Sequence, residues 1–187
     1  MAANAIPGVL KQPIGDEDHV LGAPDAPLQV IEYGDYQCPH CGKVHQIVHD
    51  LLGRYGPRVR FVFRHFPLPK VHPKARLAAE AAEAAAAEGK FWEMHDLLYS
   101  HQDALEPTDL LKYAGQLGMD LDRFRRDLEA HVHAPRVQRD LAGGVRSGVS
   151  RTPTFFINGR RHDGGYSAEE LGAALDAAAA PAGGTEK

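Results

Sequence analysis

The stretch LQVIEYGDYQCPHC, residues 28–41, joins a short apolar, β-branched run to two cysteines that lie three positions apart. The run from Leu28 to Tyr33 predicts a buried β-strand. From Pro39 to Tyr55, apolar residues recur at helical spacing, and glycine and proline then predict the end of a helix. The cysteines therefore lie at the start of a helix, where peptide dipoles and unpaired N–H groups favour negative charge and ease ionisation of the first thiol.

The two cysteines differ in their position around the predicted helix. At about 100° per residue, Cys41 falls at the edge of the apolar arc, whereas Cys38 lies towards the polar side with His45 and His49. We therefore expect Cys38 to be exposed and Cys41 to be shielded. Two cysteines are too few for a structural disulfide framework, and Cys-x-x-Cys beside a strand and a helix indicates a redox motif.

The elements on either side of this segment complete a regular order. Residues 58–63 predict a second strand, parallel to the first because a helix connects the two, and hence a right-handed βαβ unit. Residues 72–142 are predicted to be helical. A strand over 154–157, an Asn-Gly turn, a strand over 160–162 and a helix capped by Ser167 then follow. This order, βαβ…ββα, is that of an α/β thioredoxin-like fold with an all-helical insertion.

Caps and breakers mark the expected boundaries within the helical block. Helices are predicted over 72–88, over 91–101, and after the N-caps Thr108 and Asp120. The expected helix breakers are Gly89, Gly115, Gly118 and the pair Gly143-Gly144.

The chain divides into a lead-in, a thioredoxin-like domain, an insert and a tail. Proline and glycine predict an extended lead-in over 1–26. The thioredoxin-like domain is expected over 27–65 and 148–180, with the helical insert over 66–147 between its two parts. Residues 181–187 are expected to form a flexible tail.

Composition indicates one globular domain with an insert and excludes several classes of partner. Of 187 residues, 43% are hydrophobic, which is enough to bury a core. The net charge of −4 provides no basic surface for nucleic acid or anionic lipid. No run approaches the roughly 18 apolar residues of a membrane span, and residues 1–10 lack signal-peptide features. We expect a cytoplasmic monomer, or a periplasmic one if a native leader has been removed.

Four segments resemble the DsbA-like proteins of the thioredoxin superfamily. Residues 32–41 resemble their active-site segment, and Cys-Pro-His-Cys is the tetrapeptide of DsbA. Residues 148–159 resemble the cis-proline loop and the strand that follows it, while 64–68 and 89–95 are similar to the insert of short bacterial DsbA-like oxidoreductases. The resemblance implies a thiol–disulfide oxidoreductase that needs no bound cofactor and acts on protein or small-molecule thiols and disulfides.

The dithiol segment predicts distinct roles for its four residues. The Cys38 thiolate is expected to attack a disulfide, and Cys41 to resolve the mixed disulfide that forms. His40 lies where its N–H or its charge stabilises that thiolate; the alternative is a solvent-exposed histidine. Pro39 fits the first helical turn, where a missing N–H costs nothing.

Three further residues are candidates for the site. The resemblance implies a cis peptide bond before Pro153, which leaves the backbone of Thr152 free to pair with an extended substrate. Threonine at this position departs from the strongest oxidases and leaves the direction of electron flow open. Glu32, six residues before Cys38, lies where thioredoxin-like proteins keep an acid that takes the Cys41 proton; the alternative is a carboxylate in solvent at a sheet edge.

Two other patterns have competing interpretations. Cys38, Cys41, His45 and His49 nominally supply a Cys₂His₂ zinc set, but all four come from one helix, so we predict no metal site. The apolar residues within 91–99 suggest either a peptide groove or part of the core, and a helical stripe favours the core.

Other function classes stay open beside the oxidoreductase. A non-enzymatic module that binds a protein or a metal, or that senses redox state, would use the same dithiol as a ligand or sensor. A glutathione-dependent transferase or isomerase is a third candidate, against which the intact dithiol argues. The Cys-Pro-His-Cys resemblance implies an oxidant, whereas the cytosol keeps such a pair reduced, so oxidase, reductase and isomerase directions are all considered.

Overall fold

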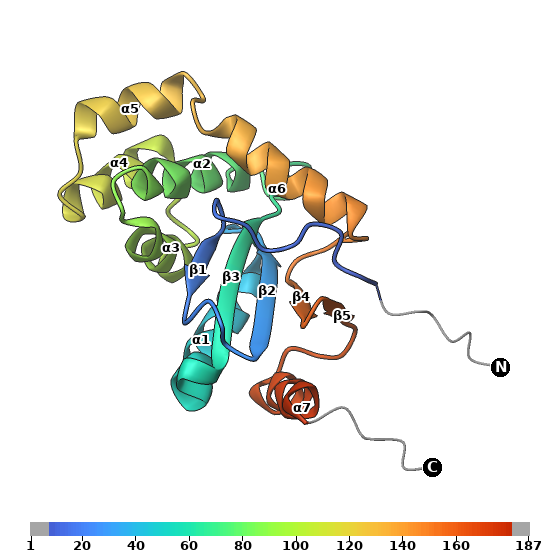
Figure 1. The fold of residues 1–187 in the computed structure, drawn as a ribbon. Coiled ribbons are helices and arrows are strands. Elements are labelled where there is room, and N and C mark those ends of the chain that lie inside the picture. Colours follow the sequence, from blue (N-terminus) through green and yellow to red (C-terminus); the bar gives the residue numbers. More distant parts are fainter. Residues whose placement is uncertain (1–7, 181–187) are drawn as a thin grey trace, which may run out of the picture.

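The computed structural model describes residues 8–180, which are built around a mixed five-stranded sheet (Figure 1). β2 runs parallel to β3, and the other neighbouring strands are antiparallel. The strand order is β1-β3-β2-β4-β5. The strands are β1 (His19–Leu21), β2 (Leu28–Gly34), β3 (Val59–His65), β4 (Thr154–Ile157) and β5 (Arg160–His162).

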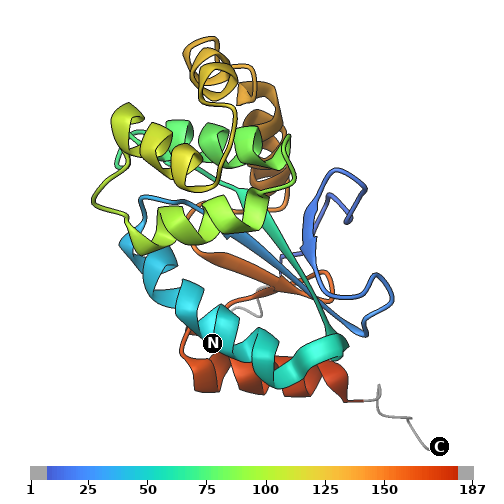
Figure 2. The same ribbon diagram turned by 90° about the vertical axis from the view of Figure 1, so that its left-hand side faces the viewer.

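The helices form two groups. α1 and α7 lie along one face of the sheet, and α2 to α6 gather beyond one end of the strands, at the top of both views (Figures 1 and 2). This is the predicted βαβ…ββα order with an all-helical insertion. The helices are α1 (Pro39–Tyr55), η1 (Gly56–Arg58), α2 (Ala75–Ala86), α3 (Phe91–Ser100), α4 (Pro107–Gln116), α5 (Leu121–Glu129), α6 (Ala134–Arg146) and α7 (Ala168–Ala179).

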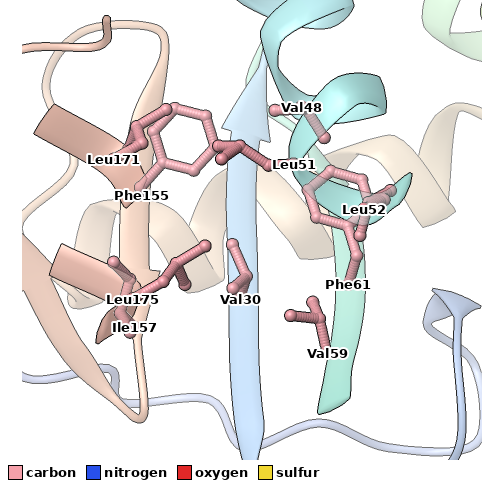
Figure 3. A pocket seen from close by; sticks show the side chains of 10 residues that line it. All are labelled: Val30, Val48, Leu51, Leu52, Val59, Phe61, Phe155, Ile157, Leu171 and Leu175. Atoms are coloured by element: carbon pink, nitrogen blue, oxygen red, sulfur yellow. The ribbon is translucent and has the colours of Figure 1, made fainter. Parts of the chain in front are cut away.

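The alternation of side chains along β2 and β3 divides the core into two layers. Val30 and Phe61 belong to the layer beneath α1 and α7, and Ile31 and Val62 to the layer on the opposite face. A small cavity of about 20 Å³ lies in the first layer, and Figure 3 shows the side chains that line it. Its lining side chains are all aliphatic or aromatic, so it offers no hydrogen bond to a ligand and is a gap in hydrophobic packing.

Several boundaries confirm the sequence predictions. α1 begins at Pro39 and ends at Tyr55, as its apolar spacing predicts. Asp120 caps α5 by accepting a hydrogen bond from the N–H of Arg123. Ser167 forms the expected capping box at the start of α7. The Asn-Gly turn between β4 and β5 has positive φ at both residues, as a type I′ hairpin requires.

Other boundaries correct those predictions. Gly143 and Gly144 do not end a helix but lie inside α6. Glycine at position 144 serves close packing instead, because a Cβ there would approach the Phe66 ring to 2.7 Å. Gly115 likewise lies within α4. The N-cap of α4 is Glu106 rather than Thr108, since a proline at the first helical position moves the helix start forward.

Arg64 holds the lead-in against the sheet. Its buried guanidinium donates to both carboxylate oxygens of Asp18 at 2.8 Å and to the carbonyls of Gln12 and Pro13, also at 2.8 Å. Such paired, charge-assisted bonds offset the cost of burying a cation. The lead-in expected over 1–26 therefore contains an anchored segment and β1. Its residues 1–7, like the tail expected over 181–187, lie outside the described residues.

Candidate active site

The loop between β2 and α1 is organised by the buried carboxylate of Asp35. Its oxygens accept hydrogen bonds from the backbone N–H groups of Gln37, at 2.8 Å, and Leu68, at 2.9 Å. A third contact, of 2.8 Å, joins it to Nδ1 of His72. The backbone N–H of Cys38 in turn donates to the Asp35 carbonyl at 3.1 Å. This network holds the chain where it approaches the dithiol, and apart from proximity to the motif no sequence pattern predicts it.

The two cysteines are free and both are buried, with 3% of Cys38 exposed and none of Cys41. The expectation that Cys38 would be exposed is wrong, because the Thr152 carbonyl oxygen covers its Sγ at 3.5 Å. Their acidities differ in the expected direction. The pKa of Cys38 is lowered to about 5. Hydrogen bonds from the Cys41 thiol, from the Thr152 side chain and from backbone N–H groups outweigh the effect of burial. Burial and the neighbouring Cys38 sulfur raise the pKa of Cys41 well above its usual value.

Pro39 and His40 lie on the exposed side of the first turn of α1. Pro39 occupies the start of the helix, as predicted. Within residues 8–180, no hydrogen bond involves the His40 side chain, whereas its backbone N–H contributes to lowering the pKa of Cys38. The influence of position 40 on the pKa of Cys38 thus comes through its backbone N–H.

Glu32 lies on β2 in the middle of the sheet, flanked by Phe63 on β3 and Phe155 on β4. It is 3% exposed, and its Oε1 has no hydrogen-bond partner among the described residues. Burial, followed by the negative charge of Cys38, raises the pKa of Glu32 to about 8. The solvated-edge alternative is thus excluded, and the carboxyl group is poised to exchange a proton near neutral pH.

Thr152 and Pro153 face the dithiol although they lie more than a hundred positions away in the chain. Pairing of β4 with β2 sets Thr154 opposite Tyr33, which brings the preceding loop to the end of β2 and the start of α1. The Thr152–Pro153 peptide bond is cis. Thr152 is 8% exposed. Its carbonyl oxygen is the atom that lies 3.5 Å from the Cys38 sulfur.

Gln102 is a site residue that sequence reasoning missed. Its side-chain nitrogen donates to the carbonyl of Tyr36 at 2.8 Å and to that of Cys38 at 2.9 Å. The close approach requires glycine at position 42, where a Cβ would lie 2.1 Å from Oε1 of Gln102. The residue follows α3 in a turn with no recognisable motif, so only the folded chain reveals it.

A cluster of aromatic rings and histidines lies beneath the dithiol. The Tyr36 hydroxyl and Nδ1 of His95 are 3.0 Å apart, and burial lowers the pKa of His95 well below its usual value. Phe91, Met94, Leu98 and Tyr99 of α3 are buried, which favours the core interpretation of that stripe. His45 and His49 do not turn towards the cysteines but towards Asp96 on α3.

These contacts place a low-pKa thiol, a high-pKa thiol, a neutral carboxyl group and the Thr152 carbonyl within one small region. A family model described as Thioredoxin matches residues 15–177, most of the chain. The chain belongs to the thioredoxin family.

Solved structures show which members of this family it is similar to. Oxidised BdbD from Bacillus subtilis matches with a TM-score of 0.81 and 25% identity, over 92% of this chain and 98% of that one. A thioredoxin-like oxidoreductase from Silicibacter pomeroyi DSS-3 has a TM-score of 0.75 and 30% identity, over 88% and 93%. The fold is also that of α-DsbA1 from Wolbachia pipientis, with a TM-score of 0.75, 22% identity and coverage of 90% and 93%. The predicted DsbA-like resemblance and thioredoxin-like fold are confirmed.

Curated relatives carry a different name. The Na(+)/H(+) antiporter NhaA 3 of Salinispora tropica is 54% identical over 167 residues, which cover 89% of this chain and 26% of the relative. The chain thus spans about a quarter of the length of the curated relatives it matches. Within residues 8–180, no helix has the length and apolar character needed to cross a membrane.

Proposed function

We propose that this chain exchanges disulfides with protein or small-thiol substrates through the pair Cys38 and Cys41. The observation that carries the proposal is the opposite displacement of the two thiol pKa values, to about 5 for Cys38 and well above the usual value for Cys41. At neutral pH this leaves one thiolate ready to attack and one thiol that keeps its proton. A structural pair of cysteines would not need this asymmetry.

In the first step the Cys38 thiolate attacks one sulfur of a substrate disulfide. A Cys38–substrate S–S bond forms, the substrate S–S bond breaks, and the second substrate sulfur leaves as a thiolate that takes a proton from water. The hydrogen bonds that stabilise the Cys38 thiolate also make it a good leaving group in the reverse direction. The same pair therefore supports oxidation or reduction of substrates, depending on the electron partner.

In the second step Cys41 resolves the mixed disulfide. Its thiol must lose a proton before its sulfur attacks Cys38, and the substrate sulfur then leaves with the electron pair of the broken bond. Glu32 is the proton acceptor in this proposal: once Cys38 is held in the mixed disulfide, its negative charge no longer raises the pKa of Glu32, so the carboxyl group ionises more readily and can take the Cys41 proton. The two cysteines end as an oxidised pair and the substrate as a dithiol.

The loop of Thr152 and Pro153 is the proposed docking edge for the substrate. The Thr152 carbonyl already lies beside the Cys38 sulfur. An extended substrate segment that pairs with this backbone would place its own sulfur next to the attacking thiolate. Pro39 and His40 border the same sulfur from the exposed side, where Pro39 begins the helix and the backbone N–H of His40 stabilises the thiolate.

The acidity of Cys38 predicts the reduction potential. Thioredoxin combines a cysteine pKa near 7 with about −270 mV, and DsbA combines about 3.5 with about −120 mV. A Cys38 pKa of about 5 therefore predicts a potential between these two values. Equilibration with glutathione, followed by alkylation and mass measurement, gives that potential. A value near the DsbA end requires an oxidising compartment, and one near the thioredoxin end suits a cytosolic reductase.

Replacing the resolving cysteine tests the proposed function directly. Cys41→Ser is expected to accumulate mixed disulfides at Cys38 with a disulfide-containing peptide, because nothing resolves them, while Cys38→Ser forms none. If Cys41→Ser forms no covalent adduct but the chain still binds its partners, the dithiol is a ligand or sensor in a non-enzymatic module. The two variants differ by one side chain each and serve as mutual controls.

A further inference from the structure

Three side chains outside the dithiol converge on one point between α1 and α3. His45 and His49 lie one helical turn apart on α1, and Asp96 lies opposite them on α3. Oδ1 of Asp96 is 3.3 Å from Nε2 of His45 and 3.2 Å from Nε2 of His49. The two more exposed side chains, His49 and Asp96, are 48% and 47% accessible, so a solute ion reaches them without a change of fold.

We propose that His45, His49 and Asp96 form a binding site for one divalent transition-metal cation such as Zn²⁺. Two imidazoles and one carboxylate are a common donor set for such ions. With metal–ligand bonds of about 2.0 to 2.1 Å, neighbouring donors of a tetrahedral site lie about 3.3 Å apart. Both nitrogen–oxygen distances are close to this spacing, and the His49–Asp96 contact at 3.2 Å is a hydrogen bond that the ion would replace.

A second observation independently points to a cation at this place. A cavity of about 30 Å³ opens beside the trio, and Glu32 is among its lining residues. The Oε1 atom of Glu32 has no hydrogen-bond partner within residues 8–180. None of the described residues that line this cavity is lysine or arginine. The described lining of the cavity therefore offers acceptor atoms to a cation and no lysine or arginine that would repel it.

A rival trio, His19, His65 and Glu83, fits a metal ion less well. Oε1 of Glu83 is 2.7 Å from Nε2 of His19 and 2.8 Å from Nε2 of His65. These are hydrogen-bond distances and are shorter than the spacing of donors around a metal. The guanidinium of Arg136 also lies 3.9 Å from the same oxygen. Its fixed charge repels a second cation, so this trio is already neutralised.

The test must exclude the cysteines, because thiolates bind the same metals. The oxidised chain, with Cys38 and Cys41 joined, is titrated with ZnCl₂ in a calorimeter near neutral pH. We expect one ion per chain. His49→Gln and Asp96→Asn are each expected to weaken binding by at least about tenfold, the low end of what loss of an outer-shell partner costs. His131→Gln is the matched control, since His131 is an exposed histidine paired with another carboxylate, that of Glu80.

Co²⁺ supplies a readout that folding differences do not mimic. Four-coordinate Co²⁺ has intense visible absorption, so the oxidised chain is expected to develop these bands and His49→Gln to lose them. Far-UV circular dichroism checks that both variants fold. The proposal is overturned if the oxidised chain binds no Zn²⁺, or if His49→Gln and Asp96→Asn bind it as well as the parent chain. Loss of binding in His19→Gln alone would place the ion at the rival trio instead.

Discussion

Glu32 and Glu83 are two buried carboxylic acids with opposite surroundings. Glu32 is 3% exposed on β2 and its Oε1 has no partner among the described residues, and burial followed by the Cys38 charge raises its pKa to about 8. Glu83 is 6% exposed on α2. Burial would raise its pKa too, but hydrogen bonds from His19 and His65 hold it well below the usual value. Equal burial thus yields a neutral acid in one place and a permanent anion in the other.

The difference separates the roles of the two parts of the chain. Glu83 joins the helical insert to the sheet through hydrogen bonds, because His19 belongs to β1 and His65 to β3. Glu32 has no such pairing among residues 8–180, and its carboxyl group holds its proton up to about pH 8. Partners, rather than burial alone, decide whether a buried carboxyl group is charged or neutral.

Glu83→Ala should have the largest effect on stability. It removes the shared hydrogen-bond acceptor of His19 and His65 and the carboxylate charge beside Arg136, which is expected to cost about 3 to 5 kcal/mol in the free energy of unfolding. A lowered pKa means that the contribution of Glu83 is present above its unfolded-state value and is lost as the pH falls through the folded value. Urea unfolding should therefore show a penalty that is full at neutral pH and shrinks from about pH 4 downwards. A pH-independent loss below about 1 kcal/mol would mean that Glu83 does not stabilise the fold as a buried anion.

Glu32→Gln should have the opposite sign and the opposite pH dependence. A raised pKa means that the stability contribution of Glu32 is present below its unfolded-state value and is lost as the pH rises towards about 8. The variant keeps the size of the side chain but cannot ionise. It should match the parent chain near pH 4 and exceed its stability by up to about 4 kcal/mol above pH 8. Equal stability of the two proteins at both pH values would mean that Glu32 is ionised or paired in the folded chain.

Gln102→Leu examines a smaller loss of polar partners. The carbonyls of Tyr36 and Cys38 lose their side-chain donor, which is expected to cost about 1 to 2 kcal/mol in unfolding free energy. Gln46→Leu is a matched control, because Gln46 is an exposed residue of α1 whose amide nitrogen donates to Asp50 at 3.1 Å. Chemical denaturation of both variants compares them. If the two substitutions cost the same, the Gln102 contacts contribute nothing beyond an exposed hydrogen bond.

His40→Ala should have the smallest effect. The backbone N–H at position 40, not the exposed ring, stabilises the Cys38 thiolate. The pKa of Cys38 is therefore expected to change by less than about one unit, or about 1.4 kcal/mol. Rates of thiol alkylation against pH measure it. A larger rise would transfer the stabilising role from the backbone to the imidazole.

Local signals in the sequence were enough for the elements that place the dithiol. The apolar run that became β2, the spacing along α1 and the Ser167 cap depend on neighbours a few residues away, and each was predicted. The prediction that Gly144 ends a helix was wrong because glycine at this position allows close contact with Phe66, and that contact depends on how α6 packs. The prediction of Thr108 as an N-cap was wrong because Pro107 occupies the first position of α4, which makes Glu106 the N-cap.

The residues of the candidate site divide in the same way, into those with a local sequence signal and those without one. The cysteines are candidates because of their Cys-x-x-Cys spacing between a strand and a helix, and Glu32 is a candidate because of the resemblance to thioredoxin-like proteins. The cover of Thr152 over Cys38, the Gln102 contacts and the meeting of His45 and His49 with Asp96 join segments far apart in the chain. No local pattern encodes such contacts, so burial of Cys38 and the roles of these residues required the folded structure.

The most direct test of the unequal acidity of the two cysteines is the pH dependence of Cys38 alkylation in the reduced, unmodified chain. The rate follows the thiolate fraction, and mass spectrometry separates modification at Cys38 from that at Cys41. We expect a midpoint near pH 5 for Cys38, with Cys41 unreactive until far higher pH. A Cys38 midpoint near the free-thiol value of about 8.5 would contradict it.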